Sequence, residues 1–295
     1  MSENPLITVG IPVFNGEKFL KKRFDSILNQ TYKNLEIIIS DNASTDNTSA
    51  LCEEFLRKEK NTQYYRQKKN LGFVSNFNFI IEQSSGKYFV FAAVDDLWEP
   101  EFLEKNIQVL EQNSNIVGSI SEIDYFGSSQ KQTQSKFTLV LKKIVRRQDV
   151  NVLEKHVRPV SGKFKNKVDK YLRFNQGSFV YGLYRTKEIK KNIIPSPLAA
   201  WDGAFILNIL KFGDLHVINE ILFHKYSGGL SSKGIIETYR RKEIPFSDIL
   251  IPNFSFLRWA CKNIGLGFCL RNIDWFILIT IYGWHLRIKE IKDIL

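Results

Sequence analysis

The sequence predicts an α/β fold of the Rossmann-like kind, in which helices flank a mostly parallel sheet. Two observations support this. Short β-rich runs alternate with helical patterns through about the first 125 residues, and acids and amides follow the ends of the predicted strands. Strands that alternate with helices of this length are typical of parallel sheets covered on both faces. A helical extension is expected at the C-terminal end of the chain.

The elements follow one another in a regular order. Leu20, Phe24 and Ile27 mark one face of the first predicted helix, and Pro100 sits where a first-turn proline belongs. Later in the chain, less regular patterns predict two more strands and a helix that ends at Gly213. The predicted strands cover residues 6–14, 35–40, 62–67, 87–94, 115–121, 178–185 and 215–224, and the predicted helices include 17–30, 44–58, 73–83 and 101–113.

Polar side chains follow three of these strands. Asn15, Asp41 and the pair Asp95 and Asp96 each lie just past a strand end. Ligands of open α/β sheets bind beyond the carboxyl ends of the strands, and adjacent strands are about 4.8 Å apart. We therefore expect these side chains to line one crevice.

The charge of the chain is unevenly distributed. The 295 residues carry a net charge of +11, but residues 1–127 hold 13 basic and 18 acidic side chains, whereas residues 128–295 hold 29 and 13. A basic second half favours an anionic partner: nucleic acid, anionic lipid or a phosphorylated substrate. A merely solvated basic surface is the alternative. Because no nucleic-acid-binding module is recognisable, we expect no nucleic-acid partner.

The compartment can also be predicted from the sequence. The three cysteines form no CxxC pair, and their number is odd, so a reducing, cytoplasmic setting is favoured. The N-terminal stretch lacks a basic n-region and carries a proline inside its apolar run, which makes it a poor signal peptide.

The adjacent acids Asp95 and Asp96 are the sharpest local signal. Two neighbouring carboxylates repel each other unless a cation or hydrogen-bond donors compensate. Their hard oxygen atoms favour Mg2+ or Mn2+, which commonly bridge protein carboxylates to substrate phosphates. The alternative is a helix N-terminus, where acids interact favourably with the helix dipole.

Two further acids flank a Ser-Thr pair. For Asp46 we favour an Asx turn and a helix cap. Asp41, at the strand end, is suited to accept hydrogen bonds from a nucleobase or a ribose.

Three stretches together resemble glycosyltransferase family 2, whose members have the GT-A fold. They are IPVFNGEKFLKKRFDSILNQTYKNLEIIISDNASTDNT, NLGFVSNFN and VDDLWEPEFL, in the family's order and spacing. The resemblance covers residues 6–125 closely and extends more loosely to about residue 232. It implies an inverting transferase that uses a nucleotide diphosphate sugar and a divalent metal ion.

The resemblance also implies roles for individual residues. It places Asp95 at the ribose and Asp96 at the metal bound to the diphosphate. AWDGAF (200–205) resembles the later motif whose acid deprotonates the acceptor, here Asp202, although a helix cap would explain that residue too. The residues expected to contact the nucleotide are Pro12, Phe14, Glu17, Asp41, Asn70 and Gly72.

Two positions depart from the family pattern. Ala93 stands where many members carry another acid, which implies a leaner metal site. The loop HKYSGGLSS resembles a motif that usually bears Arg and His, and here His224 and Tyr226 occupy those places. His224 is therefore a second candidate metal ligand.

The expected reaction moves a sugar, with UDP-type donors favoured, to a hydroxyl of a glycan or lipid-linked saccharide in cell-surface polysaccharide or glycoconjugate synthesis. A catalytically inactive carbohydrate- or lipid-binding protein of the same fold is one alternative. A nucleotidyltransferase is another, although the first strand lacks the expected glycine-rich basic loop. Neither GxGxxG nor a P-loop is present.

The chain divides by pattern into three regions. We expect a nucleotide-sugar-binding half at 1–127, an acceptor-binding half at 128–232 and a helical region at 233–295. From about residue 254 the tail is aromatic, apolar and basic, with an apolar run from Trp275 to Trp284. That run is shorter than the roughly 20 residues a span requires, so we expect a peripheral helix on an anionic membrane, at the inner face of the cell membrane. Packing on the catalytic domain or on a second subunit is the alternative, so an oligomer is a further option.

Overall fold

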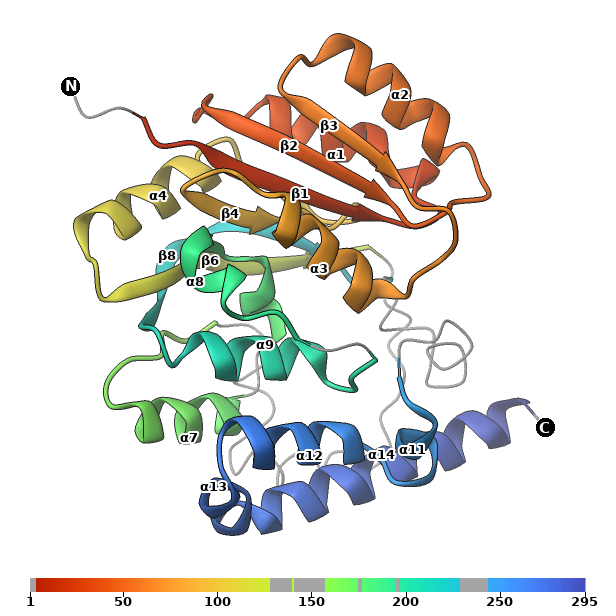
Figure 1. Ribbon diagram of the computed structural model, residues 1–295, viewed down its shortest axis with the longest axis vertical. Coiled ribbons are helices and arrows are strands. Elements are labelled where there is room, and N and C mark those ends of the chain that lie inside the picture. Colours follow the sequence, from red (N-terminus) through yellow and green to blue (C-terminus); the bar gives the residue numbers. More distant parts are fainter. Residues whose placement is uncertain are drawn as a thin grey trace.

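A computed structural model describes residues 4–127, 140, 157–174, 177–194, 197–228 and 244–294. It confirms the predicted fold class: a sheet covered by helices on both faces, followed by a helical C-terminal region (Figure 1). The first part of the expected acceptor-binding half, residues 128–175, lies mostly outside the described residues. The proposed domain borders near residues 128 and 233 lie there as well, so the three-region division stays a prediction.

The first half of the chain alternates strands and helices as predicted. Every residue of β2 is buried, as are all but one of β1, because these strands occupy the centre of the sheet and carry continuous apolar runs. The elements are β1 (Ile7–Val13), α1 (Glu17–Leu28), β2 (Leu35–Asp41), α2 (Thr48–Lys58), β3 (Thr62–Arg66), α3 (Phe73–Gln83), β4 (Tyr88–Phe91), β5 (Leu97–Trp98) and α4 (Phe102–Gln112).

The second half completes the sheet and adds the tail. Its elements are β6 (Ile116–Phe126), α7 (Phe164–Phe174), the 3-10 helix η1 (Gly177–Tyr181), β7 (Leu183–Arg185), α8 (Thr186–Lys190), α9 (Trp201–Ile209), β8 (Asp214–Tyr226), α11 (Phe246–Leu250), α12 (Phe254–Asn263), α13 (Leu266–Arg271) and α14 (Ile273–Ile294).

The sheet has the strand order β3-β2-β1-β4-β7-β6-β8-β5. The first four strands are parallel, and β6 and β8 are parallel to each other. The short strands β7 and β5 pair antiparallel with their neighbours. The sheet is therefore parallel from β3 to β4 and mixed from β4 to β5 in its strand order.

One predicted strand is wrong in part. Residues 178–185 were expected to form a single strand, but the segment begins as η1 and only its last residues join the sheet as β7. Gly182 lies between the two, and its N–H donates to the carbonyl of Phe179 at 2.9 Å. A Cβ on Gly182 would stand 2.9 Å from the carbonyl oxygen of Ser119, so the chain turns where glycine permits this close approach.

Helices cover both faces of the sheet. On one face α1 packs on α2 through stacked Phe24 and Phe55. Just after α1, the Gln30 side-chain oxygen accepts the Leu103 N–H of α4 at 3.0 Å. On the other face α3 contacts α9 through Phe77 and Trp201, with ring centroids 5.1 Å apart. The carboxyl ends of the strands remain uncovered by these packing contacts, which leaves room there for a site.

One side of the C-terminal helices, residues 244–294, packs on the rest of the chain. Phe256 and Trp259 of α12 and Trp275 of α14 are buried and belong to the hydrophobic core. The interfacial interpretation of the tail tryptophans is therefore wrong for Trp259 and Trp275, because both pack against protein. Trp284 is 51% exposed and fits that interpretation. Within the described ranges, no helix has the length and apolar character needed to cross a bilayer.

Candidate active site

The carboxyl ends of β2, β1 and β4 lie side by side, as the strand order requires. Asn15, in the loop after β1, adopts a left-handed backbone with φ of 53°. Its side-chain oxygen accepts the Thr45 N–H at 2.8 Å, and its own N–H donates to the Ser44 hydroxyl at 2.9 Å. The loops that follow the first two strands are thus joined into one rigid edge.

The helices that follow these loops are joined as well. The Glu17 carboxylate accepts the Asn47 N–H at 2.8 Å, and Asp46 accepts the N–H groups of Glu17 at 3.2 Å and Thr48 at 3.0 Å. The interpretation of Asp46 as a turn and capping residue fits this geometry. Burial raises the pKa of Asp46, but these hydrogen bonds outweigh it and lower the pKa overall. Glu17 is held at the same edge, where the sequence placed it.

Asp41 is fully buried at the end of β2. One carboxylate oxygen accepts the Ser44 N–H at 2.8 Å, and the other accepts the Tyr64 hydroxyl at 3.0 Å. The Arg66 Nε lies 3.8 Å from the second oxygen. Burial, the charge of Asp41 and its hydrogen bond raise the pKa of Tyr64. The sequence did not reveal Tyr64 and Arg66, because the strand that carries them pairs with β2 only in the folded sheet.

A second loop closes this side of the site. The side-chain oxygen of Asn70 accepts the Asn42 amide at 3.0 Å and the Gly72 N–H at 2.8 Å. Gly72 has φ of 81°, a left-handed backbone that favours glycine, and α3 begins directly after it. Pro12 and Phe14, the remaining predicted nucleotide contacts, are half-buried at the end of β1.

Asp96 is almost completely buried, with 2% of its surface exposed. One of its carboxylate oxygens accepts the Tyr226 N–H at 2.9 Å, which ties the Asp pair to the end of β8. Burial and the neighbouring charge of Asp95 raise the pKa of Asp96 to about 7. Burial likewise raises the pKa of Asp95. Burial, more than the mutual repulsion of the two acids, therefore opposes their ionisation.

Two cations near the pair were not singled out from the sequence. Arg23 is fully buried, donates to the carbonyl of Asp96 at 2.8 Å, and stacks its guanidinium 3.9 Å from the ring centre of Trp98. Burial lowers its pKa to about 9, although the charges of Asp96 and Asp95 oppose that shift. A signal for it existed: Arg23 lies three residues after Leu20 and therefore on the buried face of the first helix.

Lys225 is the second cation. Its charge favours the ionised forms of Asp95 and Asp96, and its ammonium donates to the Ser178 hydroxyl at 3.3 Å. The same ammonium lies 5.3 Å from the ring centre of Tyr181. Lys225 lies between His224 and Tyr226 in the sequence, the two residues that depart from the family motif. Its contacts with Ser178 and Tyr181 could not be predicted from the sequence.

The structure brings Asp202 to the Asp pair. Asp202 Oδ2 lies against Gly177, the first residue of η1, and Lys225 donates to Ser178 of the same helix. The next residue, Tyr226, donates its N–H to Asp96, so η1 lies between Asp202 and the Asp pair. Burial raises the pKa of Tyr181 in η1, and the charges of Asp96, Asp95 and Asp202 add to that shift. Asp202 is in the first turn of α9, where its carboxylate accepts the Gly203 N–H at 2.8 Å. The N-cap residue itself is Ala200, so Asp202 stands inside the helix.

His224 lies beside two acids other than Asp95 and Asp96. Its Nε2 lies 2.6 Å from a Glu99 oxygen, and its Nδ1 lies 3.9 Å from Asp124. In the part of the chain that the structure describes, no three His, Cys, Asp or Glu side chains form a cluster suited to a metal ion. The role of His224 as a ligand stays a prediction. Residues 229–232 of its loop lie outside the described residues.

The Asp pair nevertheless fits a divalent cation. Its oxygen atoms are hard ligands, and the ionised pair is disfavoured by its burial and by the repulsion between Asp95 and Asp96, which a bound cation would offset. Protein carboxylates that hold such an ion commonly share it with substrate phosphates, which supply the remaining ligands. Asp95 and Asp96 are the residues that would hold it.

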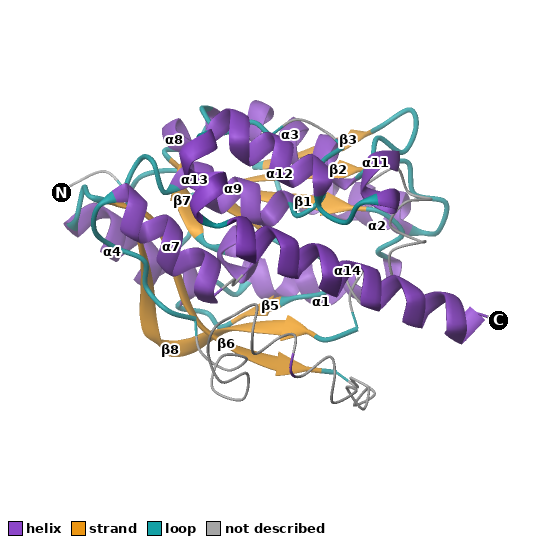
Figure 2. Cartoon of the chain, turned by 90° about the horizontal axis from the view of Figure 1, so that it is seen from below, coloured by secondary structure: helices purple, strands orange, loops and turns teal. Residues whose placement is uncertain are grey.

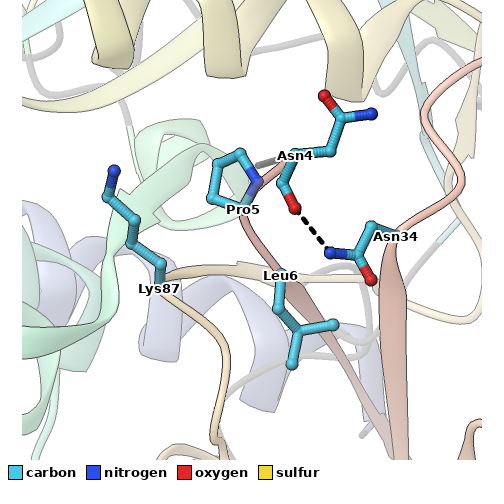
Figure 3. Close-up of a pocket in the computed structure, with 5 residues that line it drawn as sticks. All are labelled: Asn4, Pro5, Leu6, Asn34 and Lys87. Carbon is cyan, nitrogen blue, oxygen red and sulfur yellow. Dashed lines mark hydrogen bonds between the residues drawn. The ribbon is translucent and has the colours of Figure 1, made fainter. Parts of the chain in front are cut away.

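A shallow pocket at the other end of the sheet is separate from this site. Figure 3 shows it at the start of β1, with Asn4, Leu6, Asn34 and Lys87 around it. The Lys87 ammonium is paired with Glu111 at 2.7 Å. This pocket lies at the amino ends of the strands, opposite the carboxyl ends where the Asp pair sits.

Together, the fold and the convergent carboxylates define a protein of the glycosyltransferase class. The sequence profile of "Glycosyl transferase family 2" matches residues 8–182. Because this match covers more than half of the chain, the protein belongs to glycosyl transferase family 2.

Relatives with curated descriptions match the first part of the chain. An uncharacterized glycosyltransferase of Haemophilus influenzae is 38% identical over 125 residues, which is 42% of this chain and 39% of the relative. Glycosyltransferase GlyG of Streptococcus pneumoniae is 33% identical over 118 residues, 40% of this chain and 38% of the relative. The matched region thus spans well under half the length of these relatives.

Solved structures share the fold over more of the chain. S. aureus TarS 1–349 in complex with UDP-GlcNAc is similar with a TM-score of 0.56 and 17% identity, covering 92% of this chain and 78% of that one. The mannosyltransferase PcManGT of Pyrobaculum calidifontis, in complex with GDP-Man and Mn2+, has a TM-score of 0.55 and 14% identity, covering 95% and 74%. At these identities the likeness shows the GT-A fold.

Proposed function

We propose that the protein transfers a sugar from a nucleotide diphosphate sugar to a hydroxyl of a saccharide or lipid-linked acceptor, with inversion. UDP-type donors are favoured. The single observation that carries this proposal is that Asp202 and the Asp pair both adjoin η1, Asp202 through Gly177 and the pair through the strand that carries Lys225 and Tyr226. Membership of the family and the UDP-GlcNAc held by the TarS structure support the choice of donor class.

The donor would lie across the carboxyl ends of β1, β2 and β4. Asp41 is held rigid by Ser44 and Tyr64, and we propose its carboxylate as the acceptor for an N–H of a base such as uracil. Because that carboxylate is fully buried, the side chains that cover it would have to move aside. Asn70 and Gly72 would form the adjacent loop, and Asp95 would contact the ribose. A preorganised edge of this kind lowers the ordering cost of binding.

The acceptor would lie on the side of α9. Asp202 is exposed, with one oxygen on the Gly203 N–H and the other directed at Gly177. We propose that it takes the proton of the acceptor hydroxyl as that oxygen attacks the anomeric carbon. The bond to the departing diphosphate breaks on the opposite side of the sugar ring, which inverts the anomeric centre.

The diphosphate leaves with additional negative charge. Lys225 and Arg23 supply fixed positive charge near the Asp pair, and such preorganised charge stabilises a developing anion. Mn2+ or Mg2+, which Asp95 and Asp96 would hold, supplies further positive charge for the diphosphate when bound. Because the acceptor supplies the nucleophile, one base on its side is sufficient.

Two experiments test this proposal. A thermal-shift screen of UDP, TDP and GDP with Mn2+ should show UDP as the strongest stabiliser, and a ligand at 100 times its Kd adds about 2.7 kcal/mol. A hydrolysis assay with UDP-sugars and Mn2+ then reports turnover, with Asp96→Ala as the inactive comparison. Absence of any nucleotide-induced shift and of any turnover across the panel would exclude a working transferase.

A further inference from the structure

The outer side of the C-terminal helices carries an unusual concentration of exposed apolar side chains. Most large apolar residues exposed in the described part of the chain lie between residues 244 and 294. Seven of them lie on α14. Leu286, which is 42% exposed, lies on another side of the helix. The other six define what we call the outer stripe and are each 46–54% exposed: Ile273, Ile277, Ile281, Trp284, Ile288 and Ile291.

The outer stripe follows from the helical repeat. At 3.6 residues per turn, its six members fall within an arc of about 80° around the helix axis. The side of α14 that adjoins the stripe contacts protein: the Thr280 hydroxyl donates to the Pro252 carbonyl at 3.2 Å, and the Arg287 guanidinium donates to the Ile249 carbonyl at 2.6 Å. One side of α14 is thus committed to the body, whereas the outer stripe is turned to the outside.

Neighbouring helices widen this apolar surface. The Trp284 indole N–H donates to the Leu250 carbonyl at 3.1 Å, which places α11 beside the stripe, and Leu250 is itself 60% exposed. At the other end, Leu266 and Leu270 of α13 are each 62% exposed just before α14 begins. In Figure 2, α14 lies in front of the other described elements along its length. The apolar surface is therefore broader than a seam for one partner helix.

Charge identifies the occupant. Among the described residues of the tail, the exposed charged side chains are the cations Arg258, Lys262 and Arg271 and the acid Asp274. Exposed cations on the same group of helices as an apolar face, with a tryptophan in the stripe, suit the boundary of an anionic bilayer. We propose that the outer stripe is a docking surface that lies in the plane of an anionic lipid membrane.

The tail would hold the active site in a fixed orientation to that membrane. The Ser255 hydroxyl of α12 accepts the Ala199 N–H at 3.1 Å, just before α9, and the Phe256 ring stands 3.7 Å from where a Gly203 Cβ would lie. Gly203 follows Asp202 directly. Membrane docking does not depend on the transferase activity, but it would bring a lipid-linked acceptor to the side of α9.

Vesicle co-sedimentation of the full chain tests this proposal. We expect binding to vesicles of phosphatidylcholine with 30% phosphatidylglycerol, weaker binding to phosphatidylcholine alone, and weakening by salt. The triple variant Ile277→Ser, Ile281→Ser, Ile288→Ser should bind the anionic vesicles at least tenfold more weakly. The matched control, Leu28→Ser, Leu56→Ser, Ile221→Ser, removes three exposed apolar side chains elsewhere and should bind as the original chain does.

Folding and self-association are controlled in the same series. All variants are checked by thermal unfolding, and if the triple variant melts early, Ile288→Ser alone should still weaken vesicle binding about threefold. Two outcomes overturn the proposal. One is that the full chain stays in the supernatant with anionic vesicles at low salt. The other is that sedimentation velocity shows a dimer that the triple variant dissociates, because a second copy would then cover the stripe.

Discussion

Gly177 lies directly against the carboxylate of Asp202: a Cβ at position 177 would stand 2.2 Å from Asp202 Oδ2. No side chain fits in that space without displacing the carboxylate. Gly177 begins η1, the segment that also carries Ser178 and Tyr181. The residue that we propose as base is thus positioned by a glycine from a different part of the chain.

Gly177→Ala should therefore impair catalysis while leaving donor binding intact. The added methyl group pushes the Asp202 carboxylate from its position, and misplacement of a base by about 1 Å can cost about 100-fold in rate. We expect kcat to fall by roughly 10–100-fold with an unchanged Kd for UDP. Gly267→Ala is the comparison for glycine removal, since Gly267 has no left-handed backbone and a Cβ there meets nothing within 4 Å. Equal activity of Gly177→Ala and the original chain would contradict the positioning role.

Asp202→Asn tests the base itself. Asparagine keeps the size and the acceptor for the Gly203 N–H but cannot take a proton. We expect kcat to fall by roughly 10²–10⁴-fold, the usual scale for loss of a general base, with donor affinity almost unchanged. Steady-state kinetics and a nucleotide titration separate the two effects. If kcat stays within a few-fold, Asp202 acts only at the helix terminus and another group is the base.

The Asp pair should make stability depend on pH. The carboxyl of Asp96 has a pKa of about 7 in the folded chain against a usual value of 3.8, so its ionised form opposes folding. This unfavourable contribution is absent below about pH 4, grows as the pH rises and is complete above about pH 7. Asp96→Asn should thus raise the free energy of unfolding by on the order of 2 kcal/mol at pH 8 without divalent ions, and by nothing at pH 3.5. Urea unfolding at both values measures this.

Metal binding should strengthen as the pH rises through the same titration of the Asp pair. A divalent ion needs the ionised pair, so protons compete with it. We expect Mn2+ to raise the Tm of the original chain clearly at pH 8 and little at pH 5.5. Asp96→Asn, measured alongside, should show a small Mn2+ shift at both values. A Mn2+ shift that is equal at the two pH values in the original chain would place the ion elsewhere.

Arg23 should be sensitive even to a conservative change. Arg23→Lys keeps the charge but loses the planar group that stacks on Trp98 and donates to the Asp96 carbonyl. We expect a loss of about 1–3 kcal/mol in the free energy of unfolding. Lys22→Arg, the reverse exchange at the exposed neighbouring position, should change it by less than about 0.5 kcal/mol. Chemical denaturation of the two variants makes the comparison.

The sequence by itself determined the regular part of the fold and the acids at its edge. The apolar runs of β1 and β2 and the apolar face of α1 depend on local periodicity, so their positions could be predicted to within a few residues. Asp41, Asp95 and Asp96 could be placed at one edge because parallel strands end together. Asp202 was found by its resemblance to a family motif, and its nearness to the Asp pair was not visible in the sequence.

Only the tertiary structure decided what surrounds those acids. Arg23, Lys225 and Gly177 come from segments far apart in the chain, and local periodicity contains no information about which distant segments meet. The same holds for the tail, in which Trp275 and Trp284 look alike in sequence but one is 9% and the other 51% exposed. Their difference depends on which side of α14 faces the body, and long-range packing against α11 and α12 fixes that side.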